Sequence, residues 1–367
     1  MKPLVPNPGQ RGQHGPAGTP VAIPSEETST MNPTRTPGET LEQALFEVKR
    51  IVVGQDRMIE RLFVCLLARG HVLLEGAPGL AKTLAAETVA HVIGGDFARL
   101  QFTPDLVPAD LVGTRIYRPS QEAFDVELGP VFANVVLADE INRAPAKVQS
   151  ALLEVMAERQ VSIGGTTYEV PAPFLVMATQ NPIESEGVYP LPEAQRDRFL
   201  MKVLIDYPSA REEGEIVRRM SVNPPTPKPV LDPTELIALQ ETADRVFVHD
   251  AVVDYAVRLV VATRDPDKHD LADLAPQIAH GASPRATLGL VAAGRALALL
   301  RGRDYVLPQD IYDVARDVFR HRVLLSYEAM ADGVTPEAIV ERVVRTIVAP
   351  RITPGQDGEG LSAAVAS

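Results

Sequence analysis

The chain has 367 residues, 45% of them hydrophobic and 23% charged, which is enough for two domains with buried cores and is typical of globular proteins. Its net charge of -12 at pH 7 disfavours binding to nucleic acid or to an anionic membrane, because the average surface field repels phosphate groups. The single cysteine, Cys65, excludes an internal disulfide framework and favours a buried thiol in a reducing compartment.

The most apolar stretch, residues 286–300, is too short for a bilayer span and contains Arg295. We therefore expect a cytoplasmic protein with no membrane insertion. The histidines lack the paired spacing of a metal cage, so we expect no structural metal.

The first part of the chain is predicted to be disordered and the next part helical. Residues 1–38 are rich in proline and almost free of large apolar side chains, which predicts a disordered tail. Order is predicted to begin at Thr40, because Thr40 and Gln43 have the spacing of a helical capping box. A second helix is expected over residues 55–69.

The middle of the chain alternates between short apolar runs and helical patterns. Residues 71–75 predict a buried strand, residues 76–81 a glycine-rich turn and residues 82–93 a helix. Further strands are predicted at residues 98–103, 135–139, 174–179 and 199–205. This alternation predicts an α/β fold in which helices cover both faces of a parallel sheet.

Later segments complete the predicted organisation. A helix is expected over residues 145–159, and a tight hairpin over residues 161–170, around Gly164 and Gly165. The proline-rich residues 223–233 predict a linker after a core of residues 39–222. Residues 234–352 then predict a smaller helical domain, with helix starts at Ser283-Pro284 and Thr335-Pro336, followed by a flexible tail at residues 353–367.

A phosphate loop is predicted between the strand and the helix. The segment Gly76-Ala-Pro-Gly-Leu-Ala-Lys-Thr83 has the setting in which backbone N–H groups surround phosphate oxygens. Lys82 is expected to contact the β- and γ-phosphates of ATP, and the Thr83 hydroxyl to ligate Mg²⁺. Ala81 stands where the general pattern has glycine. The alternative is an ordinary Gly/Pro turn before a helix.

Two carboxylates follow the strand at residues 135–139. Asp139 is expected to hold hydrated Mg²⁺, and Glu140 to act as the general base that polarises the attacking water. Taken separately, such a pair is more often a solvated strand end. Together with the phosphate loop, it predicts an ATP-hydrolysing protein.

Four polar residues later in the chain are weaker candidates. Asn181 ends another strand, from which its amide could reach the γ-phosphate or the attacking water, although a simple turn is the alternative. Arg196 and Arg198 precede a strand and could act as an arginine finger toward a neighbouring subunit, and we favour Arg198. Arg285, in the first turn of a helix, suggests a nearby anion because the helix dipole disfavours a cation there.

The sequence resembles the MoxR-type AAA+ ATPases over about residues 40–350. The motifs that carry the resemblance are Gly76–Thr83, Leu137–Lys147, Ala178–Pro182, Glu193–Phe199 and Gly281–Arg285. Ala81 is typical of this family. Arg196 stands where the family commonly has an apolar residue, which leaves open whether Arg196 or Arg198 is the finger.

The resemblance implies a P-loop α/β core with a helical lid, assembled as a ring of six subunits with ATP between neighbours. It assigns the sensor 1 role to Asn181 and the sensor 2 role to Arg285, places Val53, Gly54 and Gln55 near the adenine, and implies insertions at residues 113–131 and 161–170. The residues expected to contact nucleotide are Gly54, Gln55, Gly76, Ala77, Pro78, Gly79, Leu80, Ala81, Lys82, Thr83, Leu84 and Asp139.

The resemblance also implies a chaperone-like activity on protein clients, alongside partners with von Willebrand factor A domains. Our leading hypothesis is an ATPase that converts hydrolysis into motion of lid against core and so remodels a client. Two alternatives stay open: an assembly module that binds ATP as a switch without hydrolysing it, and a ring motor that translocates DNA.

Overall fold

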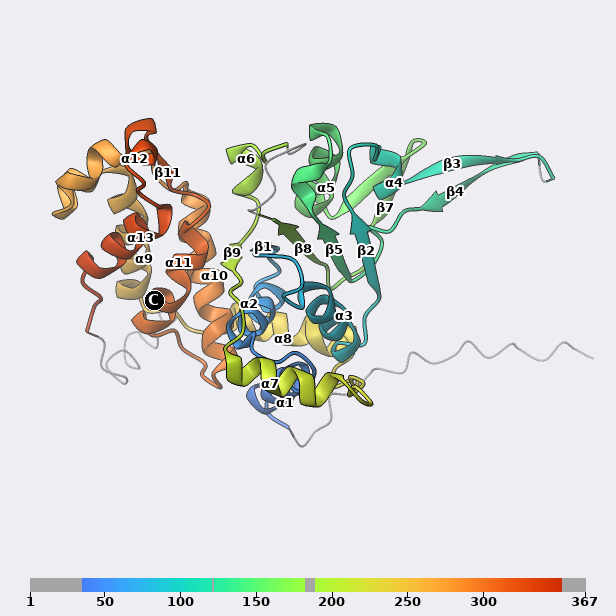
Figure 1. Ribbon diagram of the computed structural model, residues 1–367, viewed down its shortest axis with the longest axis horizontal. Coiled ribbons are helices and arrows are strands. Elements are labelled where there is room, and N and C mark those ends of the chain that lie inside the picture. The colour runs from blue at the N-terminus through green and yellow to red at the C-terminus, as the bar shows by residue number, and fades with distance from the viewer. Residues whose placement is uncertain (1–34, 121, 182–188, 352–367) are drawn as a thin grey trace, which may run out of the picture. The chain divides into compact units, whose positions relative to one another are not determined.

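A computed structural model of the chain describes residues 35–120, 122–181 and 189–351 (Figure 1). The strands of its main sheet are β1 (Val72–Glu75), β2 (Phe97–Gln101), β5 (Val135–Asp139), β8 (Leu175–Gln180) and β9 (Met201–Leu204). Their order is β2-β5-β8-β1-β9, and every neighbouring pair is parallel. The predicted parallel sheet is therefore confirmed.

Alternate residues of the buried strands face two separate hydrophobic clusters. In β1, Val72 and Leu74 belong to one cluster, whereas Leu73 belongs to the other. Successive side chains of a strand point to opposite faces, so both faces of this sheet are covered. This explains why the central strands are continuously apolar and do not alternate with polar residues.

Helices cover the two faces of the sheet and form the region that follows it (Figure 1). The helices up to the last strand of the sheet are α1 (Pro37–Ile51), α2 (Asp56–Leu67), α3 (Lys82–Val92), α4 (Pro108–Val112), the 3₁₀ helix η1 (Ile141–Arg143), α5 (Ala146–Glu158) and α6 (Glu193–Arg196). Those that follow are α7 (Ala210–Met220), α8 (Pro233–Arg245), α9 (Asp250–Arg264), η2 (Pro266–His269), η3 (Ala272–Gln277), α10 (Pro284–Leu300), α11 (Pro308–Phe319), α12 (Tyr327–Ala331) and α13 (Pro336–Thr346).

The first helix begins earlier than the sequence predicts. Its N-cap is Thr36, whose hydroxyl accepts from the Glu39 N–H, and the Glu39 carboxylate accepts from the Thr36 N–H at 2.8 Å. The capping box is thus Thr36 and Glu39, and the prediction of Thr40 and Gln43 is wrong. Pro37 at the first helical position favours the earlier start, because its fixed φ suits a helix and it has no N–H to satisfy.

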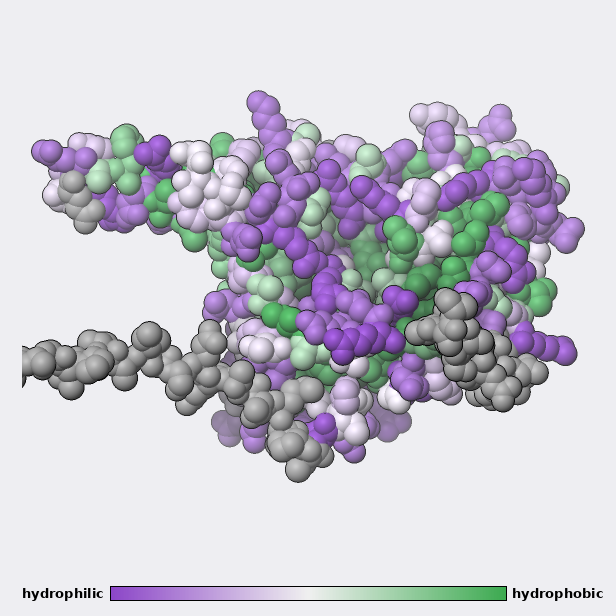
Figure 2. Space-filling view, turned by 180° about the vertical axis from the view of Figure 1, so that it is seen from behind, coloured by the Kyte–Doolittle hydropathy of each residue, from purple (hydrophilic) through white to green (hydrophobic). Residues whose placement is uncertain are grey.

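Two hairpins extend from the sheet region. The predicted hairpin around Gly164 and Gly165 is confirmed as β6 (Gln160–Ile163) and β7 (Thr166–Glu169), with positive φ at both glycines. Within residues 113–131, β3 (Gly113–Arg118) and β4 (Ala123–Leu128) form a second antiparallel pair. Figure 2 shows apolar patches among hydrophilic residues on this hairpin, and its exposed apolar residues are Ile116, Tyr117, Phe124 and Leu128.

The part of the chain that follows Asp232 is mostly helical. Ser283 and Thr335 are the N-caps of α10 and α13, with proline at the next position, as predicted. A short antiparallel pair, β10 (Ile278–His280) and β11 (Leu324–Leu325), is the exception. One hydrophobic cluster runs through α2, α8, α10 and α11, so the helical region shares its core with one face of the sheet.

Buried charges join α2 to α11. The carboxylate of Asp317, which has no exposed side-chain surface, accepts from Arg61 Nε at 2.8 Å and from Arg320 Nη1 at 2.8 Å, and Arg57 adds a third contact. Burial raises the pKa of Asp317, but the neighbouring guanidinium groups outweigh it, so the net shift of its pKa is downward. The carboxylate is therefore held ionised between the two helices.

None of the helices within the described residues is long and apolar enough to cross a bilayer. Cys65 is buried in α2, as predicted, and burial raises the pKa of its thiol.

The buried His71 provides a test of the core. The Val176 N–H donates to its Nδ1 at 3.0 Å, and its Nε2 lies 3.2 Å from the Met156 carbonyl oxygen, so both nitrogens are engaged by a neutral ring. Burial lowers its pKa to about 4. Below its unfolded value near 6.5, the unfolded chain binds a proton that the folded chain does not, so stability falls as the pH decreases.

We expect His71 to reduce the free energy of unfolding by about 2 kcal/mol between pH 7 and pH 5. Urea denaturation at both pH values, in the wild type and in His71→Gln, measures this difference. Between pH 7 and pH 5, the free energy of unfolding of the variant should fall by about 2 kcal/mol less than that of the wild type. An equal loss in the two proteins would show that His71 does not titrate in this way.

Candidate functional site

The loop between β1 and α3 has the backbone of an anion-binding turn. Gly79 has φ +82°, and Ala81, the residue before α3, has φ +57°, in the left-handed region. This conformation explains why glycine is the usual residue at the position of Ala81. No side chain caps α3, so the N–H groups of its first turn point out of the helix end without a side-chain partner.

The start of the loop is packed against the end of β9. A Cβ on Gly76 would lie 2.7 Å from the carbonyl oxygen of Ile205, so only glycine fits there without a backbone shift. The residues that follow Ile205 lie against Gly54 and Gln55. Gln55 Nε2 donates to the Asp206 carbonyl at 3.1 Å, and a Cβ on Gly54 would lie 3.0 Å from Pro208.

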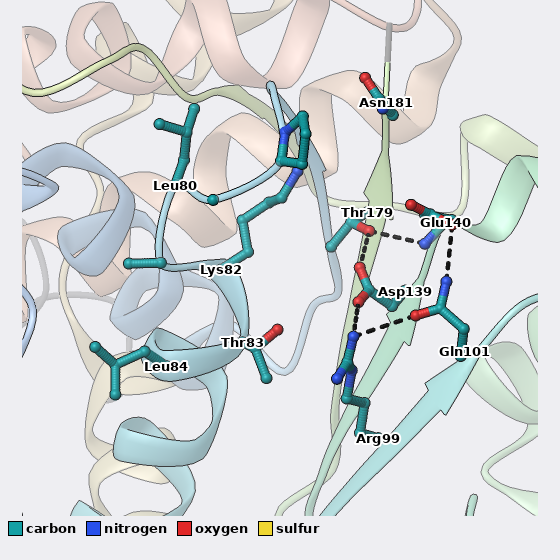
Figure 3. A pocket seen from close by; sticks show the side chains of 13 residues that line it. Leu80, Lys82, Thr83, Leu84, Arg99, Gln101, Asp139, Glu140, Thr179 and Asn181 are labelled. Atoms are coloured by element: carbon teal, nitrogen blue, oxygen red, sulfur yellow. Dashed lines mark hydrogen bonds and ion pairs between the residues drawn. The ribbon is translucent and has the colours of Figure 1, made fainter. Parts of the chain in front are cut away.

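The loop and the ends of three strands line one cavity of about 450 Å³ (Figure 3). The residues that line it are Pro78, Gly79, Leu80, Ala81, Lys82, Thr83, Leu84, Arg99, Gln101, Asp139, Glu140, Thr179 and Asn181. The structure thus brings together the predicted residues from Pro78 to Leu84 with Asp139, Glu140 and Asn181. Gly54, Gln55, Gly76 and Ala77 do not line this cavity. Gly76 and Ala77 begin the loop, whereas Gly54 and Gln55 lie against the segment that follows β9.

Lys82 is held by the loop that precedes it. Its Nζ donates to the Gly76 carbonyl at 2.8 Å across the turn. Partial burial lowers the pKa of Lys82, while Asp139 and Glu140 act in the opposite direction. The ammonium group is therefore positioned at the loop by a backbone contact and faces two carboxylates across the cavity.

The hydroxyl of Thr179 connects the two carboxylate residues. It donates to Asp139 Oδ1 at 2.6 Å and accepts from the Glu140 N–H at 2.8 Å (Figure 3). Glu140 has φ +57°, so the chain turns sharply after β5 and the two consecutive side chains can both line the cavity. Asn181, two residues after Thr179, is buried at the end of β8 and lines the same cavity.

Arg99 and Gln101, on the neighbouring strand β2, contact these carboxylates. Arg99 Nη2 lies 2.7 Å from Asp139 Oδ2, and Gln101 Nε2 donates to Glu140 Oε2 at 2.8 Å. Sequence reasoning missed both residues. Their spacing of two at the end of a strand was the available signal, but only the register of β2 against β5, which pairs Gln101 with Asp139, places them at the site.

Arg143, in η1, also contacts Glu140. Its Nη1 lies 3.0 Å from Glu140 Oε2, the oxygen that accepts from Gln101. The Glu140 carboxylate is therefore held from two sides by hydrogen-bond donors.

The predicted arginines lie elsewhere. Arg198 and Arg285 line a second cavity of about 330 Å³, together with Asp197 and Arg322. Arg198 Nη1 donates to the Leu153 carbonyl at 2.5 Å, and Arg285 Nη1 lies 3.8 Å from Asp197 Oδ2. The structure brings these two arginines together with each other, and not with the phosphate loop of the same chain.

The chemistry of the first cavity fits Mg²⁺ and a polyphosphate. Mg²⁺ takes oxygen ligands and is usually held by one or two protein groups together with substrate phosphates and water. The Thr83 hydroxyl and the Asp139 carboxylate provide such oxygens. In the part of the chain that the structure describes, no cluster of three or more His, Cys, Asp or Glu could hold a metal by itself.

A phosphate loop and an acidic strand end that meet at the carboxyl edge of a five-stranded parallel sheet define a P-loop nucleotide-binding protein. Residues 71–201 match the family model described as ATPase family associated with various cellular activities (AAA), and residues 272–343 match the AAA lid domain.

Individual relatives narrow this class. The chain is 63% identical over 313 residues to Chaperone MoxR1 of Mycobacterium tuberculosis, which covers 85% of this chain and 83% of the relative. It is 36% identical over 327 residues to Protein MoxR of Paracoccus denitrificans, covering 82% and 93%. A crystal structure of a protein from Cytophaga hutchinsonii matches with a TM-score of 0.82 at 46% identity, covering 86% and 96%. The chain therefore belongs to the MoxR-type AAA+ ATPases.

Thr179 provides a test of the site that does not depend on activity. Thr179→Val removes the donor to Asp139 and leaves the Glu140 N–H without its acceptor. We expect this variant to lose about 1–3 kcal/mol of unfolding free energy, because a buried polar group left without a partner costs about that much. Thr179→Ser keeps the hydroxyl and serves as the control in urea denaturation. Equal stability of the valine and serine variants would contradict the bridging role.

Proposed function

We propose that the protein hydrolyses ATP with Mg²⁺ and uses this reaction to remodel or activate a protein client. The observation that carries the proposal is the single cavity in which Lys82 and the loop face Asp139, Glu140 and Asn181. ATP hydrolysis needs a loop that binds phosphate, a carboxylate that can hold Mg²⁺ and a second group that can activate water.

The proposed binding roles follow the chemistry of each group. The backbone N–H groups of the loop and the Lys82 ammonium bind the phosphates, and Thr83 and Asp139 hold Mg²⁺. When bound, Mg²⁺ neutralises charge on the phosphate oxygens. Gly54 and Gln55 lie against the segment beside the start of the loop, which supports a place for them near the adenine.

Glu140 is proposed as the general base. Its carboxylate accepts hydrogen bonds from Gln101 and lies beside Arg143, so its position depends on neighbours as well as on its own backbone. A base must be within hydrogen-bond reach of the proton that it takes from water. Asn181 is proposed to orient the same water or the γ-phosphate with its amide, as sensor 1.

Arg198 and Arg285 are proposed to act on the nucleotide of a neighbouring subunit. Their common cavity is separate from the phosphate loop of their own chain, which supports action between subunits. Hydrolysis would then require a ring-shaped homo-oligomer, which we propose to be hexameric, with Arg198 as the finger and Arg285 as sensor 2. The core at residues 39–222 and the lid at residues 234–352 remain our proposed division of the chain.

The chaperone role is proposed from the relatives. One of them is named Chaperone MoxR1, and this supports a protein client for the present chain. A partner with a von Willebrand factor A domain and a cytoplasmic location are part of the same proposal.

Two substitutions test the ATPase assignment. Lys82→Ala should weaken ATP binding at least about tenfold, because the phosphates lose a charged contact. Glu140→Gln should bind ATP as the wild type does but lose most of its turnover, about 100-fold or more, because the base is removed. Isothermal titration calorimetry measures the first effect, and phosphate release measures the second.

The outcomes of this experiment separate the alternatives. Unchanged ATP affinity in Lys82→Ala would contradict the loop assignment. A wild type that binds ATP but shows no turnover, alone or assembled, would favour the non-hydrolytic switch. Turnover that is stimulated by DNA would favour the DNA motor.

Mixing two inactive variants tests action between subunits. Arg198→Ala should turn over about 100-fold more slowly or worse, while its ATP affinity is unchanged, because a finger acts on the transition state. A Glu140→Gln subunit still supplies Arg198, and an Arg198→Ala subunit still supplies Glu140. Their mixture should therefore recover turnover, whereas Arg198→Ala mixed with the double variant should not. Equal turnover of the two mixtures would show that Arg198 does not act across subunits.

A further inference from the structure

Asp197 lies between the two candidate finger arginines, Arg196 and Arg198. It is the point at which the lid contacts the segment Glu193–Phe199, which we call the finger segment. Its Oδ1 accepts from Arg322 Nε at 2.7 Å, and its Oδ2 accepts from Ser283 Oγ at 2.8 Å. The same Oδ2 lies 3.8 Å from Arg285 Nη1. One carboxylate thus meets the N-cap of α10, the arginine in the first turn of α10 and an arginine that follows α11.

Arg322 uses all its donors on this region. Beyond Asp197 Oδ1, its Nη1 donates to the carbonyls of Leu200 and Val318, and its Nη2 donates to the carbonyls of Asp197 and Phe199. The side chain is only 3% exposed. Such a buried guanidinium requires a nearby carboxylate, and Asp197 provides it.

The backbone on both sides of Arg198 is therefore fixed by the lid. Arg322 contacts the carbonyls of the residues before and after Arg198, and His321 Nε2 lies 3.0 Å from the Phe199 carbonyl oxygen. Arg198 itself donates to Leu153, in α5. The position of its guanidinium thus depends on α5 and on the lid together.

Arg285 is held much less firmly than Arg322. Its side chain is 60% exposed, and its contact with Asp197 is long. An exposed ion pair of this kind contributes little to stability. Arg285 can consequently leave Asp197 for a stronger anion, while Arg322 and Ser283 keep Asp197 in place.

We propose that Asp197 is a positioning residue that sets Arg198 and Arg285 side by side, so that the finger and the lid arginine approach a neighbouring subunit's phosphates as one unit. Arg322 anchors the segment, and Asp197 keeps Arg285 within reach until the phosphate takes it. This inference rests on the proposed function.

Asp197→Asn tests the inference, because asparagine keeps the shape and loses the charge. We expect turnover to fall about 10- to 100-fold, as for a misplaced catalytic group. ATP affinity should not change, because the phosphate loop lies in the other cavity. The decisive measurement is a double-mutant cycle with Arg198→Ala, in which turnover is measured by hydrolysis of radiolabelled ATP. If Asp197 acts through the two arginines, Asp197→Asn should lower turnover much less once Arg198 is absent.

Asp310→Asn is the matched control. Asp310 is a buried aspartate of the lid, which accepts from Arg301 and Arg303 and, among the residues that the structure describes, makes no hydrogen bond or ion pair with residues 193–199. Asp310→Asn should lower thermal stability about as much as Asp197→Asn does. It should change turnover less than about twofold, since Asp310 lies away from the site. Asp197→Glu keeps the charge on a longer side chain and should give a turnover between those of the wild type and Asp197→Asn. It also provides a folded variant in case Asp197→Asn does not fold.

Several outcomes would overturn the inference. The first is an equal loss of turnover from Asp197→Asn with and without Arg198. The second is a similar loss of turnover in Asp310→Asn. Full turnover in Arg198→Ala would remove the finger assignment and this inference with it, whereas the loss of turnover in Glu140→Gln would still support the ATPase assignment.

Discussion

The parallel pairing of β8 between β1 and β5 is the constraint on which the site depends. Because the carboxyl ends of parallel strands meet at one edge of a sheet, this pairing brings the phosphate loop after β1, the acidic pair after β5 and Asn181 after β8 to one cavity. The Thr179 hydroxyl then joins two of these strand ends by hydrogen bonds. Residues far apart in the sequence thereby become one chemical unit.

The sequence predicts those parts of the site that are local in the chain. The loop from Gly76 to Thr83 and the pair after β5 carry their spacing and their strand context within a few residues, so periodicity and motif suffice. Arg99 and Gln101 could not be found in this way. Their contacts depend on the register of β2 beside β5, which is a property of the folded sheet and not of the β2 sequence.

The wrong capping box and the unpredicted cavity of Arg198 and Arg285 have a similar origin. Thr36 and Thr40 both precede residues suited to a helix start, and the structure selects Thr36 because Glu39 and Pro37 support it together. For Arg198 and Arg285, the motifs predict the residues but not their common location. Their shared cavity lies where the lid packs against the segment before β9. This packing depends on contacts between residues far apart in the sequence, such as Arg322 and Asp197.

The buried charges between α2 and α11 restrict how the lid can move. Separating these helices would leave Asp317 and Arg61 as unpaired charges in an apolar environment, which costs about 3–5 kcal/mol for a buried pair. The shared hydrophobic cluster adds to this cost. If ATP drives a motion of the lid, as proposed, the motion is easiest when α2 moves with the lid. The surface helix α7, which contains no buried residue, and the segment before it would then adjust. That segment contacts Gln55 and the start of the phosphate loop, so under the same proposal a change at the nucleotide site would act on the connection to the lid.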